Sequence, residues 1–91
     1  MDMTQAVQSA KTAGDHDVLA KHYEDAAKQM RVKAEEHKKL LAQYEAKRSL
    51  YGKYAQSLIS HCQGLVRMYE QAVAENMGMA KSHREMAAEA K

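Results

Sequence analysis

Apolar and polar positions repeat every seven residues over two long stretches of the chain, a spacing that matches two turns of an α-helix. The expected core row of the first stretch is His16, Tyr23, Met30, His37, Tyr44 and Tyr51. The expected core row of the second is Leu58, Cys62, Leu65, Tyr69, Ala72, Asn76, Met79, His83 and Met86, with Ile59, Val66, Val73 and Ala80 beside it. The pattern predicts two amphipathic helices, over residues 15–49 and 56–90.

The segment Tyr51-Gly52-Lys53-Tyr54 is predicted to turn the chain between these helices. Glycine is common where a helix ends in a left-handed conformation. A single continuous helix is the competing prediction, because the seven-residue repeat runs from Tyr51 to Leu58 without a slip. A turn near Gly52 makes residues 15–91 a long antiparallel hairpin, in which His16 comes opposite the end of the second helix.

The first 14 residues are small and polar, and are predicted to form a flexible or short helical segment. Thr12 and Asp15 have the spacing of a helix-capping pair. An internal repeat supports the hairpin: residues 15–42 align with residues 61–88 at a shift of 46 positions. The alignment places Tyr23 on Tyr69 and His37 on His83, while His16 falls on Cys62.

Composition predicts that two hairpins pair into a four-helix-bundle homodimer. Leu, Ile and Val together contribute 12 residues, Ala contributes 16, and Phe, Trp and Pro are absent. Alanine forms helices well but buries little surface. A lone hairpin of this composition has a small core, and self-association is the usual way to enlarge it.

The charged residues are mixed in sign, with 14 basic and 12 acidic side chains. Asp17/Lys21 and Glu24/Lys28 are spaced to pair along an exposed helix face. A nucleic-acid surface needs a basic stripe, which this chain lacks. No apolar run is long enough to span a bilayer. We therefore expect neither nucleic acid nor a membrane as a partner.

Ligand-type side chains occupy predicted core positions, where Leu would be more stabilising. Met79, His83 and Met86 share one helix face, with His16 opposite, and His37 comes near Cys62. His61 is adjacent in sequence but points about 100° away around the helix. Helical bundles build metal sites from side chains on facing helices. The sequence predicts two transition-metal sites. One would be held by His16, Met79, His83 and Met86, and the other by His37 and Cys62, with His61 reaching it only at a subunit seam or through local distortion.

Imidazole together with thioether favours copper, and Cys with His also suits zinc or haem iron. No nucleophile–base set and no phosphate-binding glycine loop is present, so the predicted role is binding and not catalysis. Two alternatives stay open. One is a structural or interaction module without a cofactor, whose histidines fix the register of the helices. The other is a bundle that loosens when buried histidines become charged at low pH.

Two further sequence patterns are HxxLA…HYExAA…AEEHKKL and HCQxLxxMYExA…MAxSHREMA. This repeat resembles small exported bacterial helical-hairpin proteins, and among them the anammox c-type cytochromes, which pair into four-helix bundles and ligate haem through His and Cys. The resemblance implies a periplasmic protein and places the matching ligand at His61-Cys62. Covalent haem attachment needs CxxCH, whereas this chain has one cysteine. The resemblance therefore implies the fold and export more than a cofactor.

Overall fold

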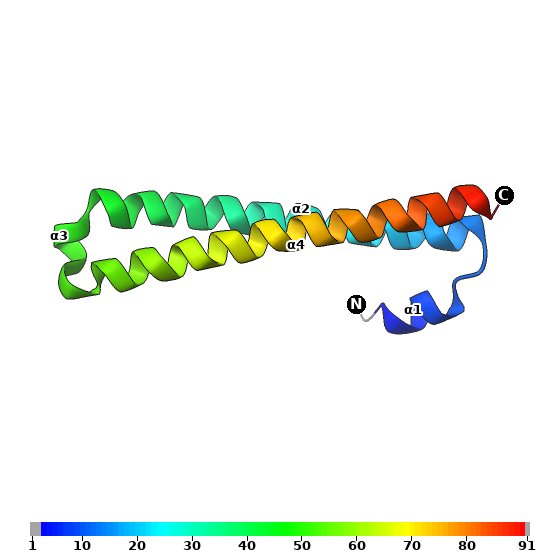
Figure 1. Ribbon diagram of the computed structural model, residues 1–91, viewed down its shortest axis with the longest axis horizontal. Helices are drawn as coiled ribbons and strands as arrows, with labels where there is room; N and C mark the ends of the chain where they lie inside the picture. The colour runs from blue at the N-terminus through cyan, green and yellow to red at the C-terminus, as the bar shows by residue number, and fades with distance from the viewer. Residues whose placement is uncertain (1–2, 91) are drawn as a thin grey trace. The chain divides into compact units, whose positions relative to one another are not determined.

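The computed structural model describes residues 3–90, which form helices and no strand. The elements are α1 (Thr4–Ser9), α2 (Ala13–Ala46), α3 (Arg48–Tyr51), the 3₁₀ helix η1 (Gly52–Tyr54) and α4 (Ala55–Glu89) (Figure 1). The chain divides into two compact units. Unit 1 consists of the described parts of 1–27 and 74–91, and unit 2 of residues 28–73. The all-α prediction is confirmed.

In unit 1, a reciprocal cap fixes the start of α2. The Asp15 amide donates to Thr12 Oγ1 at 3.1 Å, and Asp15 Oδ2 accepts from the Lys11 and Thr12 amides at 3.0 and 3.1 Å. These amides also hold the pKa of Asp15 below its ordinary value. The expected pair of Thr12 and Asp15 thus caps the helix, which begins two residues before the predicted start.

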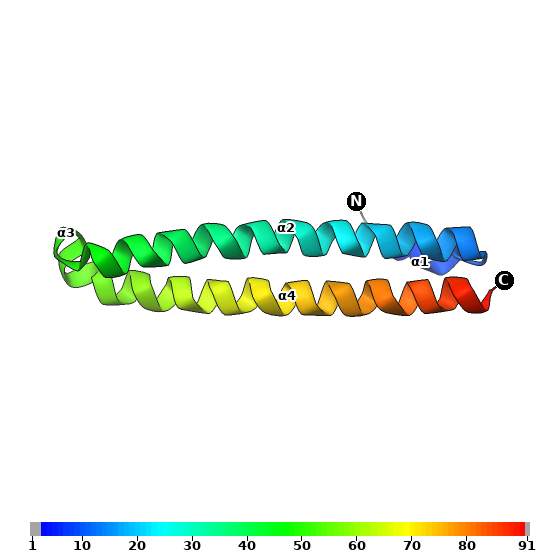
Figure 2. The ribbon, with the colours of Figure 1, turned by 90° about the horizontal axis from the view of Figure 1, so that it is seen from above.

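In unit 2, α2 ends at Ala46, three residues before the predicted end. The reason is the backbone of Lys47, whose φ of −121° and ψ of 39° are not helical. Gly52 then takes φ 57° and ψ −131°, a region that residues with a Cβ rarely adopt. Unit 2 is therefore a helical hairpin, visible in Figure 2, and the prediction of one continuous helix is wrong.

Within each unit α2 packs against α4 through one face of each helix, and we call these two faces the seam. On α2 the seam residues are His16, Ala20, Tyr23, Ala27, Met30, Ala34, His37, Leu41 and Tyr44. On α4 they are Ala55, Ile59, Cys62, Val66, Tyr69, Val73, Asn76, Ala80, His83 and Ala87. All of them are buried or half-buried, at alternating spacings of three and four residues, as in a coiled coil.

The predicted core row of α4 was only half correct. Cys62, Tyr69, Asn76 and His83 belong to the seam. Leu58, Leu65, Ala72, Met79 and Met86 lie beside it. The residues predicted to flank the row, Ile59, Val66, Val73 and Ala80, lie in the seam instead, together with Ala55 and Ala87. The seam contains mostly Ala and β-branched side chains on this side, which let the helices approach closely. The larger Leu and Met side chains therefore stand outside, although they are the more hydrophobic ones.

The short helix α1 covers one side of α2 in unit 1. Ala6 and Ser9 of α1 and the following Ala10 line a small hollow together with Val18 and Leu19 of α2. Leu19 is only 1% exposed although it stands just outside the seam. The N-terminal segment, predicted to be flexible or short helical, thus forms a short helix that lies beside Leu19. Residues 1 and 2 lie outside the described residues.

Candidate functional site

Two histidines meet across the seam of unit 1. His16 Nδ1 of α2 lies 3.1 Å from His83 Nδ1 of α4, and the two rings are stacked with centroids 5.3 Å apart. His83 is 6% exposed and His16 is half-buried. At this distance one imidazole N–H donates to the lone pair of the other nitrogen, so the pair shares one proton. The expected approach of His16 to His83 is what the structure shows.

Tyr23 encloses the histidine pair from the α2 side. Its ring stacks on His83 with a centroid distance of 5.7 Å and an interplanar angle of 9°. Sequence reasoning identified Tyr23 as a core residue without connecting it to the histidines. The sequence does contain an indication of this contact, because Tyr23 lies one heptad after His16 on the same face of the helix.

The environment of His83 favours the neutral imidazole. Burial in the seam, followed by the proximity of His16, lowers the pKa of His83 below its ordinary value of 6.5. Desolvation disfavours the charged form of a histidine, and a second imidazole nearby adds to that effect. A neutral ring keeps a nitrogen lone pair that can bind a proton or a metal ion.

An arginine joins the two helices beside this pair. Arg84 Nη1 lies 3.0 Å from Asp17 Oδ1, and Arg84 Nη2 lies 2.9 Å from Glu24 Oε1. The expected pairing of these carboxylates with Lys21 and Lys28 along α2 is replaced by this contact between helices. Lys21 pairs instead with Asp25, at 2.8 Å. All these groups are partly solvated, so the contacts mainly fix the register of α2 against α4.

Met79 and Met86 do not complete a buried cluster with the histidines. They lie beside the seam on α4, and their side chains are 44% and 43% exposed. On a helix they stand four residues before and three residues after His83, hence on the neighbouring surface. The structure therefore brings together His16 and His83 and leaves both thioethers at the surface next to them.

In unit 2 no hydrogen bond joins the two residues of the predicted His37–Cys62 cluster. Cys62 is a free thiol, 6% exposed, in the seam. His37 stacks on Tyr69 with centroids 5.4 Å apart. The Nδ1 atom of His37 is buried and has no hydrogen-bond partner among the described residues. A buried imidazole nitrogen without a partner is unusual, because leaving it unsatisfied costs about 1–3 kcal/mol.

The internal repeat relates the two units. Tyr23 stacks on His83 in unit 1, and the equivalent Tyr69 stacks on His37 in unit 2. The same shift places Cys62 at the position equivalent to His16. In unit 1 the buried histidine has a nitrogen partner, whereas in unit 2 a thiol stands at that position and the histidine nitrogen is unpaired.

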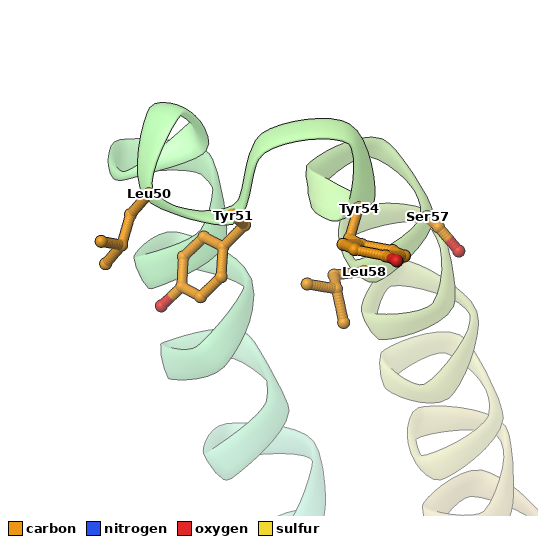
Figure 3. Close-up of a pocket in the computed structure, with 5 residues that line it drawn as sticks. All are labelled: Leu50, Tyr51, Tyr54, Ser57 and Leu58. Carbon is orange, nitrogen blue, oxygen red and sulfur yellow. The ribbon is translucent and has the colours of Figure 1, made fainter.

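The other residues near the predicted clusters lie elsewhere. His61 is exposed, on the outer side of α4. Tyr44 of the predicted core row packs edge-to-face on Tyr51 with centroids 4.8 Å apart. The turn of unit 2 also holds an open hollow of about 420 Å³, lined by Leu50, Tyr51, Tyr54, Ser57 and Leu58 (Figure 3). Figure 3 shows that the side chains of Tyr51 and Tyr54 project from opposite ends of the turn.

Two features are absent from residues 3–90. No group of three or more His, Cys, Asp or Glu side chains is placed to hold a metal ion together. No helix in this range is long and apolar enough to cross a membrane.

Comparison with protein-family models, with curated proteins and with solved structures finds no match for the chain. The resemblance to exported helical-hairpin proteins and small cytochromes therefore stays a prediction from the sequence pattern.

Proposed function

We propose that the protein is a non-enzymatic binding protein that holds a single soft transition-metal ion, copper(I), between His16 and His83. The observation that supports it is the 3.1 Å distance between the two Nδ1 atoms. Metal–imidazole bonds of about 2.0–2.1 Å on two nitrogens at that distance enclose an angle of about 100°. A metal ion would replace the proton that the two rings share.

The methionines next to the His16–His83 pair indicate which metal the proposed site would bind. Thioether and imidazole together suit Cu(I), because soft ligands select soft ions. Met79 and Met86 have three rotatable side-chain bonds and stand on the surface beside His83. In this proposal one thioether turns inward when the ion binds. Zinc is the second candidate, since it also binds neutral imidazole.

The unit 2 pair is a second candidate site in the same proposal. The unpaired Nδ1 of His37 favours it, because a metal ion held between that nitrogen and the Cys62 thiolate would satisfy the buried atom. Metal affinity that is unchanged in a variant carrying both His37→Ala and Cys62→Ala would remove this second site.

Two broader features belong to the same proposal. The protein acts as a homodimer in which two hairpins form a four-helix bundle, which enlarges a core made largely of alanine. It works in the periplasm, as the resemblance to exported proteins implies.

The test of the metal site is an anaerobic Cu(I) titration against a chromophoric competitor. The wild-type chain is compared with His83→Gln and with His61→Gln, a control that alters an exposed histidine. His83→Gln is expected to weaken binding at least about tenfold, which is about 1.4 kcal/mol. His61→Gln is expected to leave it unchanged. Equal affinities for wild type and His83→Gln would leave the histidines with a structural role.

A further inference from the structure

The two sides of the seam differ in chemistry in unit 2. On one side Lys38 Nζ of α2 lies 3.2 Å from Glu70 Oε2 of α4 and 3.3 Å from Glu35 Oε1 of its own helix. On the opposite side stand Leu40 of α2 and Leu58, Leu65 and Met68 of α4. We call these four residues the apolar flank. In an antiparallel helix pair the two sides of a seam face opposite directions, so the flank is separate from the ion pairs.

The apolar flank is largely open to solvent. Leu40 is 42% exposed and Met68 is 68% exposed, while Leu58 and Leu65 are half-buried. Leu19 offers a comparison in unit 1, because it precedes Leu40 by three heptads and stands at the same helical position. Leu19 lies beside α1 and is 1% exposed. A leucine at this helical position therefore becomes buried when another helix packs against it, as α1 does at Leu19.

We infer that the apolar flank of unit 2 docks on the same flank of a second copy of this chain. The inference rests on the proposed homodimer and names its surface. The helical segments 28–46 and 55–73 are each about 28 Å long at 1.5 Å per residue. Two such helices side by side offer about 500–600 Å² per copy, so a pair buries about 1,100 Å², near the lower limit of stable interfaces.

Charge selects the arrangement of the two copies. The basic side chains next to the flank, Lys33 and Lys47, both stand on α2, where Glu36 lies 3.6 Å from Lys33 Nζ, whereas Leu58, Leu65 and Met68 give α4 an uncharged edge. Packing α2 on α2 of the second copy would bring lysines together. A two-fold axis along the helices instead places α4 of one copy over α2 of the other and keeps the lysines apart.

This arrangement brings Leu65 of one copy against Leu40 of the other. Within a hairpin, His37 lies level with Tyr69 and Lys38 with Glu70, so Leu40 and Leu65 are at nearly the same height. A two-fold axis along the helices preserves height, and the two leucines therefore meet between copies, twice in each dimer.

The test measures self-association of the purified full chain by analytical ultracentrifugation over a range of concentrations. Leu65→Glu and Leu40→Lys are expected to raise the dimer dissociation constant at least about tenfold each. Gln63→Glu is the matched control, since it adds the same charge to an exposed position on the other side of α4. That control is expected to dimerise like wild type. Circular dichroism of each variant verifies that the helices remain folded.

An equimolar mixture of Leu65→Glu and Leu40→Lys variants provides the decisive measurement. If the residues meet between copies, the opposite charges form a heterodimer, and mixing restores association that neither variant shows alone. Should either variant lose helicity, Met68→Glu replaces it, because that side chain is already exposed.

Two results would overturn the inference, and they differ. A wild-type chain that stays monomeric at every concentration rejects both the proposed dimer and the surface. A dimer that persists in Leu65→Glu and Leu40→Lys keeps the dimer and rejects the apolar flank as its interface. Association only in the presence of another protein would likewise reject a second copy as the occupant.

Discussion

Leu19 is the largest side chain that is fully buried within residues 3–90. It occupies the space between α2 and α1, and no other residue of the described core combines such size with such burial. The core of unit 1 otherwise consists mainly of alanines. A single leucine therefore carries a large share of the apolar burial in this unit.

Leu19→Ala is expected to lower the free energy of unfolding by about 2–5 kcal/mol, the usual cost of truncating a buried leucine. Leu50→Ala is the matched control, because Leu50 is 70% exposed. Its expected effect is within about 0.5 kcal/mol. Urea unfolding followed by circular dichroism measures both. Equal effects of the two substitutions would show that Leu19 is not a core residue.

His83 makes the stability of unit 1 depend on pH. The pKa of His83 in the folded chain is lowered from 6.5, so the unfolded chain binds the proton more readily. Its contribution is fully present above pH 6.5 and is lost as the pH falls below 6.5 toward the lowered pKa. His16 and Tyr23 face His83 from α2, and Arg84 forms ion pairs with Asp17 and Glu24 beside the histidine pair.

The thermal midpoint of the wild-type chain is therefore expected to decrease between about pH 7.5 and about pH 5. His83→Gln should reduce this dependence, while His61→Gln should retain it, because His61 is exposed. Differential scanning calorimetry at a series of pH values measures the slope. A wild-type midpoint that does not change over this range would contradict the lowered pKa of His83.

The pairing of His16 with His83 could be predicted from the sequence, because heptad spacing and a hairpin register determine which residues face each other. The positions of Met79 and Met86 could not. Both are strongly hydrophobic, and the sequence pattern alone placed them in the core. The helices instead approach through small and β-branched side chains such as Ala80, which leaves the longer thioethers beside the seam.

At the level of elements, two glycines have opposite roles. Gly52 turns the chain in unit 2 with φ 57° and ψ −131°. Gly78 lies inside α4, and a Cβ added there would meet no atom within 4 Å in the described structure. The backbone conformation at position 52 requires a glycine. Gly78 only destabilises α4, because glycine loses more conformational entropy on folding than alanine does.

Gly52→Ala is expected to destabilise the protein by about 1–3 kcal/mol, the cost of a strained backbone conformation. Gly78→Ala is expected to stabilise it by about 0.5–1 kcal/mol, because alanine favours the helix. Thermal unfolding of both variants beside wild type gives the two signs in one experiment. A stabilising Gly52→Ala would show that the turn does not need this conformation.

The helix boundaries show where sequence reasoning stops. Both long helices were predicted from the heptad repeat, and Thr12 and Asp15 identified the first N-terminus. The end of α2 was missed because nothing in the composition around Lys47 distinguishes it from the preceding helix. At Lys47 the backbone leaves the helical conformation, and α3 and η1 then connect α2 to α4. This break in the helix is determined by the closed turn of unit 2 and not by the local sequence.

For the whole molecule, the hydrophobic core described by the structure is small. The described hydrophobic core contains six alanines and only four larger residues, Leu19, Ile59, Cys62 and Val66. A 91-residue chain with such a core sits near the lower limit for independent folding. In the proposed homodimer, self-association and binding of the ion would therefore raise the population of the folded state.

The single cysteine allows that population to be observed directly. Cys62 is buried in the seam of unit 2, so an alkylating reagent reaches its sulfur only when the two helices of that unit separate. The labelling rate, divided by that of an exposed thiol, gives the fraction of time for which unit 2 is open. Ser60→Cys in a Cys62→Ala background provides the exposed reference, because Ser60 faces solvent on the same helix.

Labelling of Cys62 is expected to be slower than that of the reference thiol and to accelerate when Val66 is shortened to alanine, which weakens the neighbouring seam contact. Mass spectrometry of the alkylated chain over time measures both rates. Equal rates for Cys62 and the reference thiol would mean that the hairpin is open most of the time. The alkylation rate of Cys62 in the native chain thus reports how often the two helices of unit 2 separate.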